Sequence, residues 1–218
     1  MSPASSEHGA TRVSRTPSQV VEDYLKVIYG HTEWQHEPIT PKRLGERLGL
    51  APSSVTETVK RLTAQGLVEH PRYGAIALTA AGEAEALRMV RRHRLVETWL
   101  VQEYGYGWDE VHDEAEVLEH ALSDRMLDLI DARLGYPERD PHGDPIPDSE
   151  GAVPATRGFL LAELTRGVVG VVTRISDEDP AVLRELTARG IGLDSSVRAG
   201  DVSMDAENAV WVVVDSPE

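Results

Sequence analysis

Apolar residues recur at helical spacing through the first third of the chain, and glycines mark the breaks between the helical stretches. The pattern predicts a first helix over 18–29, a second that begins with Thr40 and Pro41 and ends at Gly49, and a third from about 52 to 65. The tight break between the second and third helices indicates a helix-turn-helix.

A hairpin and two longer helices are predicted next. Residues 67–79 alternate as two short strands around a turn at 72–74, which completes the order of a winged helix-turn-helix. Helical periodicity then returns over 81–103 and again from 109 to about 134.

The rest of the chain changes character. Pro, Gly and Asp crowd a stretch that is typical of a linker, and short β-rich runs with one helix, PAVLRELTARG, follow it. We therefore expect a mainly α protein with small β parts. The predicted units are a disordered tail (1–17), a winged helix-turn-helix (18–80), a helical domain (81–136), a linker (137–156) and a small β-rich domain (157–218).

Charge and cysteine content narrow the classes of function. The net charge is −15, but Lys and Arg against Asp and Glu number 9 and 8 over 1–80, 7 and 18 over 81–150, and 6 and 11 over 151–218. The acidic middle favours bound cations, whereas the near-neutral start does not exclude nucleic acid. The chain has no cysteine, which excludes disulfides and thiolate metal sites and fits a cytoplasmic protein. We expect no membrane segment and no signal peptide, because no apolar stretch is long enough.

The second helix of a helix-turn-helix enters the major groove, and short polar side chains on its first turns meet the base edges. Lysines and arginines nearby suit phosphates. The candidate DNA-binding residues are Ser53, Ser54, Thr56, Glu57, Lys60, Arg61, Lys42, Arg43 and Arg72. A protein-binding winged helix with solvated basic residues is the alternative. Because the local charge is only +1, we expect a homodimer on double-stranded operator DNA.

The segment VHDEAEVLEH (111–120) holds a set of metal-ligand residue types on one helical face. His112, Glu116, Glu119 and His120 fall within about 100° of one another, beside an apolar stripe. Partly buried imidazoles and carboxylates need a compensating partner, and a divalent cation satisfies all four.

Two further positions add to this set. His93 and Glu97 lie one helical turn apart inside an apolar stripe, and Asp23 lies beside the apolar line of the first helix. The alternatives are a hydrogen-bonded core histidine and an ion pair of Asp23 with Arg91 or Arg92. Nitrogen and oxygen ligands without sulfur suit Mn²⁺ or Fe²⁺, although Co²⁺ or Zn²⁺ would still bind.

A di-metal hydrolase is the alternative to a metal sensor for these residues. A di-metal hydrolase also gathers His and carboxylates on helices. The chain has neither an H-E-x-x-H motif nor a phosphate-cradling glycine loop, so we expect no catalysis and no small organic substrate.

Five motifs, EDYLKVIY, SSVTETVKRL, RRHRLVETWL, VHDEAEVLEH and DPHGDPIP, closely resemble the diphtheria toxin repressor family, nearest to its manganese transport regulators. The resemblance covers about 18–150 and, more weakly, the C-terminal part. It implies a helical metal-binding and dimerisation domain, a C-terminal FeoA-like β-barrel, and a metal-loaded dimer that represses metal-uptake genes, with an iron-responsive repressor as the alternative.

The resemblance also implies two metal sites. The primary site would use Asp23, Glu116, Glu119 and His120, and the ancillary site would use His93, Glu97 and His112. Two departures affect this assignment. Lys26 stands where compact manganese regulators have a ligand glutamate, so we do not expect their dinuclear arrangement. Arg174 stands where the barrel of iron regulators has an acid that binds the ancillary metal, which leaves Asp177 as a weak candidate for an ancillary ligand from this segment.

Overall fold

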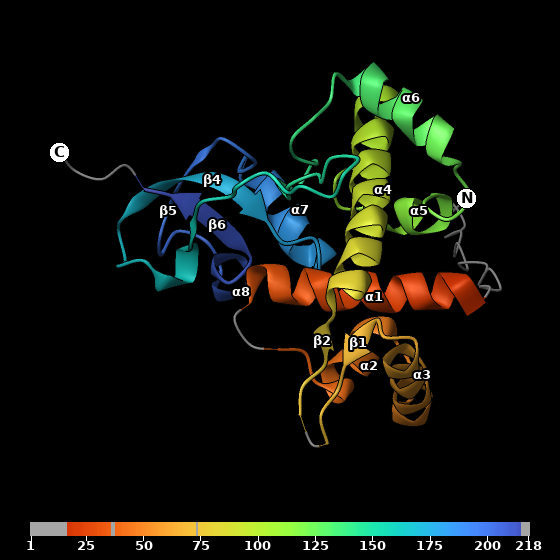
Figure 1. The fold of residues 1–218 in the computed structure, drawn as a ribbon. Helices are drawn as coiled ribbons and strands as arrows, with labels where there is room; N and C mark the ends of the chain where they lie inside the picture. The colour runs from red at the N-terminus through yellow and green to blue at the C-terminus, as the bar shows by residue number, and fades with distance from the viewer. Residues whose placement is uncertain (1–16, 36–37, 73, 215–218) are drawn as a thin grey trace, which may run out of the picture.

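The computed structural model describes residues 17–35, 38–72 and 74–214, and Figure 1 shows how its elements are arranged. The long helix α4 stands on α1, the helix-turn-helix lies on the other side of α1, and the C-terminal sheet lies beside both (Figure 1). Within the described part of the chain, no helix combines the length and apolarity that crossing a bilayer requires. The predicted tail 1–17 lies almost wholly outside the described residues.

The helices and strands have the following bounds. They are α1 Pro17–Trp34, α2 Pro41–Leu48, α3 Pro52–Ala64, β1 Val68–Glu69, β2 Ala77–Leu78, α4 Ala80–Tyr104, α5 Val111–Leu118, α6 Asp124–Leu134, β3 Phe159–Leu160, the 3₁₀ turn η1 Leu161–Glu163, β4 Val169–Ile175, α7 Pro180–Ala188, β5 Ser196–Arg198, α8 Met204–Glu207 and β6 Val210–Val213.

The predicted winged helix-turn-helix is confirmed. Thr40 caps α2 by accepting a hydrogen bond from the Arg43 amide, and Gly49 ends it in the left-handed conformation at φ 63°. A Cβ on Gly45 would lie 3.2 Å from both the Leu50 carbonyl oxygen and a methyl of Val55, so glycine allows the tight turn into α3. Buried side chains of α1, α2, α3 and the wing form one core.

The prediction of one helix over 109–134 is wrong in one respect, because the structure has two helices there, α5 and α6. Ser123 caps α6 by accepting from the Met126 amide. The Arg92 guanidinium donates to the carbonyl oxygens of Glu119, at 2.9 Å, and Leu122. These contacts satisfy carbonyls that a continuous helix would have used, so the chain turns after His120.

The predicted linker is buried over about a third of its length. Residues 142–147 are buried, as is Asp140, and Ile146 joins the core between α4 and α6. Its composition predicted the lack of helix and strand but not the burial. The domain boundaries themselves stay a prediction.

The C-terminal part contains an open four-stranded sheet with the order β3-β6-β4-β5. The FeoA-like β-barrel that the resemblance implied is not confirmed, and the strands of the described residues do not close into a barrel. The edge strands β3 and β5 have only two and three residues. The helix α7 covers the sheet instead, because its Val182, Leu183 and Leu186 are buried in the same core as the central strands.

An aromatic contact docks this sheet onto α1. The Arg174 guanidinium of β4 lies 4.3 Å from the Trp34 ring centre and 4.2 Å from that of Trp211 in β6. Arg174 also donates to Asp144 at 2.7 Å. Arg174 therefore stabilises the contact between α1 and the C-terminal sheet.

Candidate metal centre

Asp23, Glu119 and His120 form the first cluster of possible ligands, here called the Asp23 cluster. One ligand atom from each lies within 4.8 Å of the others. The two hydrogen-bonded atoms Asp23 Oδ1 and His120 Nε2 are 2.9 Å apart, and Glu119 Oε1 is 3.4 Å from the same nitrogen. Asp23 comes from α1, whereas Glu119 and His120 lie in the turn after α5. The two arginines considered as partners of Asp23 pair with other acids, Arg91 with Asp131 and Arg92 with Asp124.

His93, Glu97, His112 and Asp177 form the second cluster, here called the His112 cluster. His93 Nε2 lies 2.9 Å from Glu97 Oε1 and 3.2 Å from His112 Nδ1. Asp177, from the turn after β4, places Oδ2 3.1 Å from the same His112 nitrogen. The weak candidate Asp177 therefore joins the predicted ancillary residues through the fold of the C-terminal part.

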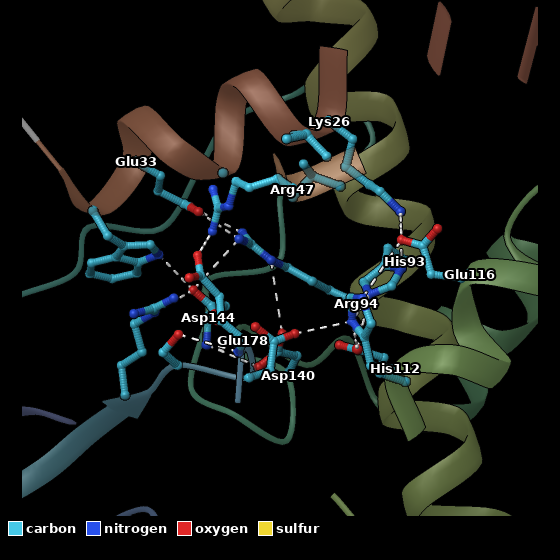
Figure 2. A pocket seen from close by; sticks show the side chains of 18 of the residues that line it. Lys26, Glu33, Arg47, His93, Arg94, His112, Glu116, Asp140, Asp144 and Glu178 are labelled. Carbon is cyan, nitrogen blue, oxygen red and sulfur yellow. Dashed lines mark hydrogen bonds and ion pairs between the residues drawn. The ribbon is translucent and has the colours of Figure 1, made fainter. Parts of the chain in front are cut away.

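Glu116 behaves differently from the prediction. Its carboxylate groups with His93 and Glu119, and not with Asp23 and His120. The Lys26 ammonium holds it there, donating to Glu116 Oε1 at 2.5 Å and to Glu119 Oε1 at 2.6 Å. Figure 2 shows Lys26 reaching from α1 towards Glu116 and His93. Glu119 also contacts His93, with 2.5 Å between Oε2 and Nδ1, so the two clusters touch.

The electrostatics of both clusters favour charged side chains. Burial opposes protonation of His93, but the negative charges of Glu97 and Glu119 outweigh it and raise its pKa to about 9. Burial would raise the pKa of Glu116, yet Lys26 and His93 lower it to about 2. Burial likewise disfavours the charge of Lys26, and Glu119 and Glu116 reverse this and raise its pKa.

Sequence reasoning missed three residues near these clusters. Glu22 Oε2 lies 2.9 Å from His120 Nδ1 and orients that imidazole. Asp140 and His142 form a buried group with Glu97. The signal for the last two was the spacing D-x-H in DPHGDPIP, which the linker-like composition concealed.

The chemistry of these residues fits a divalent cation. The groups offer imidazole nitrogens and carboxylate oxygens within ligand-sharing distance, and most are buried. The buried His142 Nδ1 makes no hydrogen bond with the described residues, and Glu97 Oε2 lies 3.8 Å from it. A buried nitrogen without a hydrogen bond is costly, and a metal ion would satisfy it.

The candidate DNA-binding residues are exposed on α2, α3 and the wing. Val55, Val59 and Leu62 bury the inner side of α3, which leaves Ser53, Ser54, Thr56, Glu57, Lys60 and Arg61 exposed. Lys42 and Arg43 are exposed at the start of α2, and Arg72 is exposed in the wing. The Thr56 hydroxyl donates to the Pro52 carbonyl at 2.9 Å, so it is partly engaged within the helix.

Two family models match this architecture. The iron-dependent repressor N-terminal DNA-binding domain matches residues 18–76, and the iron-dependent repressor metal-binding and dimerisation domain matches 79–148. The iron-dependent repressor IdeR of Mycobacterium bovis is 37% identical over 172 residues, which are 76% of this chain and 71% of that relative. The IdeR of Mycobacterium leprae is 37% identical over 128 residues, 58% of this chain, and the chain spans about half of that relative, 54%.

Solved structures agree with the sequence matches. A manganese-dependent transcriptional repressor in complex with manganese is 45% identical, with a TM-score of 0.83 over 89% of this chain and 99% of that one. The manganese regulator SloR is 30% identical, with a TM-score of 0.76 over 89% and 98%.

The chain therefore belongs to the iron-dependent repressor family, which includes the diphtheria toxin repressor. Its class is that of metal-dependent transcriptional repressors and not of enzymes, so the di-metal hydrolase considered above is excluded.

Proposed function

We propose that this repressor responds to Mn²⁺ and that its metal-loaded dimer binds operator DNA to repress metal-uptake genes. One observation carries the proposal: ligand residues from α1, α4 and α5 and the turns after α5 and β4 converge on two touching clusters. The helix α1 also shares a core with the recognition helix α3. An ion bound between these elements would fix how the DNA-reading unit sits on α4.

The proposed ligands follow from the clusters. Asp23, Glu119 and His120 would hold one ion, with Glu116 available if its carboxylate turns towards them. His93, Glu97 and His112 would hold the other with Asp177, and His142 lies within reach of Glu97. The metal supplies positive charge and geometry here and takes part in no reaction.

The donor atoms favour manganese. Both clusters contain carboxylate oxygens and imidazole nitrogens without sulfur, which makes them hard sites. The 45% identical manganese-dependent transcriptional repressor, whose structure is a complex with manganese, supports this choice. The relatives named as iron-dependent repressors keep Fe²⁺ as the competing metal, and Zn²⁺ and Co²⁺ would bind in vitro.

Exposed surfaces support the two partners. The polar face of α3 suits the major groove of an operator, with Lys60 and Arg61 directed at phosphates. On α6, Met126 and Leu129 are 38% and 57% exposed, an apolar surface that suits a second copy of the chain. Two recognition helices would then meet successive turns of a pseudo-palindromic site.

Calorimetric titration and DNA selection together test the proposal. The metal-free protein would be titrated with Mn²⁺, Fe²⁺, Co²⁺ and Zn²⁺, and duplexes would be selected from a random library with Mn²⁺ or with a chelator. We expect up to two ions per chain, and enrichment of a pseudo-palindrome with Mn²⁺ alone. Enrichment of the same sequences under chelation would overturn metal control.

A matched pair of variants locates the effect. Asp23→Ala removes the ligand that α1 contributes, so Mn²⁺-dependent DNA binding should be lost while the fold persists. Asp205→Ala removes an exposed acid from α8, outside both clusters and the proposed dimer surface, and should change neither property. Shifting such an equilibrium from 1:99 to 99:1 needs about 5.5 kcal/mol of preferential metal binding, which several coordination bonds can supply.

A further inference from the structure

Lys26 is a part-buried cation placed among the proposed metal ligands. Its side chain is 12% exposed, and its ammonium contacts Glu116 and Glu119 at 2.5 and 2.6 Å. The ammonium nitrogen also lies 3.4 Å from His93 Nδ1. A charged ammonium cannot coordinate a metal, because all its lone-pair capacity is used by protons.

We propose that the Lys26 ammonium is a tethered counter-ion that a divalent metal must displace from Glu116 and Glu119, and that it thereby sets the metal concentration at which the protein responds. This inference rests on the proposed metal-binding function. It adds a residue that opposes the ion instead of holding it.

Lys26 and the proposed metal compete for the same carboxylate oxygens. Glu119 Oε1 accepts from Lys26 and lies 3.4 Å from His120 Nε2, so this oxygen faces both the ammonium and the Asp23 cluster. Glu116 Oε1 is likewise paired with Lys26, which accounts for its separation from Asp23 and His120. An ion that coordinates these two oxygens together with His120 must displace the ammonium from both of them.

The positive charge of Lys26 also opposes metal binding electrostatically. A unit positive charge held a few ångströms from a divalent ion repels it strongly at the dielectric of a part-buried site. The ammonium also neutralises part of the carboxylate charge that would attract the ion. Both effects lower metal affinity while the lysine stays, and both end when its charge is removed.

Displacement of Lys26 would also change how α1 is joined to α5. Lys26 and Asp23 lie on the same helix, one turn apart, so the ammonium already joins α1 to α5 without a metal. Exchange would release Lys26, whereas Asp23, which already contacts His120 at 2.9 Å, would become a ligand of the ion. The metal would therefore replace the ammonium as the link between α1 and Glu116.

Affinity measurements on charge variants test the exchange. We expect Lys26→Met to bind Mn²⁺ at least about tenfold more tightly by calorimetry, and Lys26→Arg to stay within about threefold of the wild type. The control Arg133→Met also removes one positive charge, but from an exposed pair with Glu103, and should leave the affinity unchanged. An affinity of Lys26→Met equal to or weaker than the wild type overturns the proposal.

A measurement on the unmutated protein makes the test independent of folding. The chain has three lysines, and Lys42 and Lys60 are exposed, so spectra of lysine labelled at the ε-carbon are simple. Saturation with diamagnetic Zn²⁺ should move the Lys26 resonance towards those of the other two, and an unmoved resonance overturns the exchange. If the wild type binds neither Mn²⁺ nor Zn²⁺, the proposed function itself fails.

Discussion

The histidines of the clusters must lose protons before they can bind a metal. Burial opposes the charge of His142, but Glu97 and Asp140 outweigh it and raise its pKa to about 10, and the pKa of His93 is raised to about 9. Both imidazoles are therefore protonated near neutral pH in the metal-free protein. Glu116, with a pKa of about 2, is ionised throughout and adds no pH dependence.

We therefore predict that metal binding releases protons and that Mn²⁺ affinity rises with pH. Each displaced proton contributes up to about tenfold per pH unit below the histidine pKa, and the rise should level off above about 9. Calorimetry in two buffers of different ionisation enthalpy, from about pH 6.5 to 8.5, counts the protons. A pH-independent affinity without proton release would contradict the assignment of His93 as a ligand.

The metal-free fold should show the opposite dependence. A histidine with a raised pKa stabilises the folded state below its ordinary pKa of about 6.5, and this contribution is lost as the pH rises through the raised value. Urea unfolding of metal-free protein should therefore show lower stability towards pH 9, where Mn²⁺ would restore it.

Single residues were predictable where chemistry and spacing agreed. His93 and Glu97, and the residues of VHDEAEVLEH, combined ligand types with helical spacing, and the structure brings them together. Lys26 departs from the pattern of the compact manganese regulators, but its contacts with Glu116 and Glu119 depend on how α1 lies against the segment 111–120. Residue spacing within one helix carries no information about that packing. His142 was missed because composition says nothing about burial.

The packing of α4 against the wing gives a prediction at the scale of elements. A Cβ on Gly82, in the first turn of α4, would lie 1.9 Å from the Leu67 carbonyl oxygen. Gly82→Ala should therefore reduce the free energy of unfolding by about 3 kcal/mol, as overpacking against backbone does. Urea denaturation monitored by circular dichroism measures this loss.

Gly30→Ala is the matched control, because its added Cβ would meet no atom of the described residues within 4 Å beyond its own stretch of helix, and it occupies the interior of α1. Alanine is the better helix former, so this variant should be as stable as the wild type or more stable by up to about 1 kcal/mol. Equal effects of the two substitutions on the free energy of unfolding would show that helix propensity, and not the contact with Leu67, determines the stability of Gly82→Ala.

The elements were predictable as far as local signals reached. Thr40, Pro41 and the two glycines after α2 and α3 gave the helix-turn-helix with boundaries close to those observed. The break between α5 and α6 was missed because Arg92, from another helix, stabilises it. The closed barrel followed from a weak resemblance, whereas short edge strands and a covering helix give an open sheet.

The proposed dimer gives a prediction for the whole molecule. Leu129 lies on the outer face of α6 with 57% of its surface exposed. Leu129→Asp should shift the protein from dimer to monomer and weaken Mn²⁺-dependent DNA binding by more than tenfold, since one recognition helix alone holds little DNA. Light scattering and DNA titration measure the two effects.

Met204→Asp is the control for this variant, because Met204 is 77% exposed on α8, a different element. It should stay dimeric and bind DNA normally. If the Leu129→Asp protein remains a dimer, α6 does not form the dimer interface.

The stack of Arg174 between Trp34 and Trp211 has an optical consequence. Two of the four tryptophans of the chain share one cation across the contact between α1 and the C-terminal sheet. Separation of the sheet from α1 would remove the guanidinium from at least one indole and expose that ring to water. The intrinsic fluorescence of the unlabelled protein therefore reports, in real time, whether the last third of the chain is seated on the first helix.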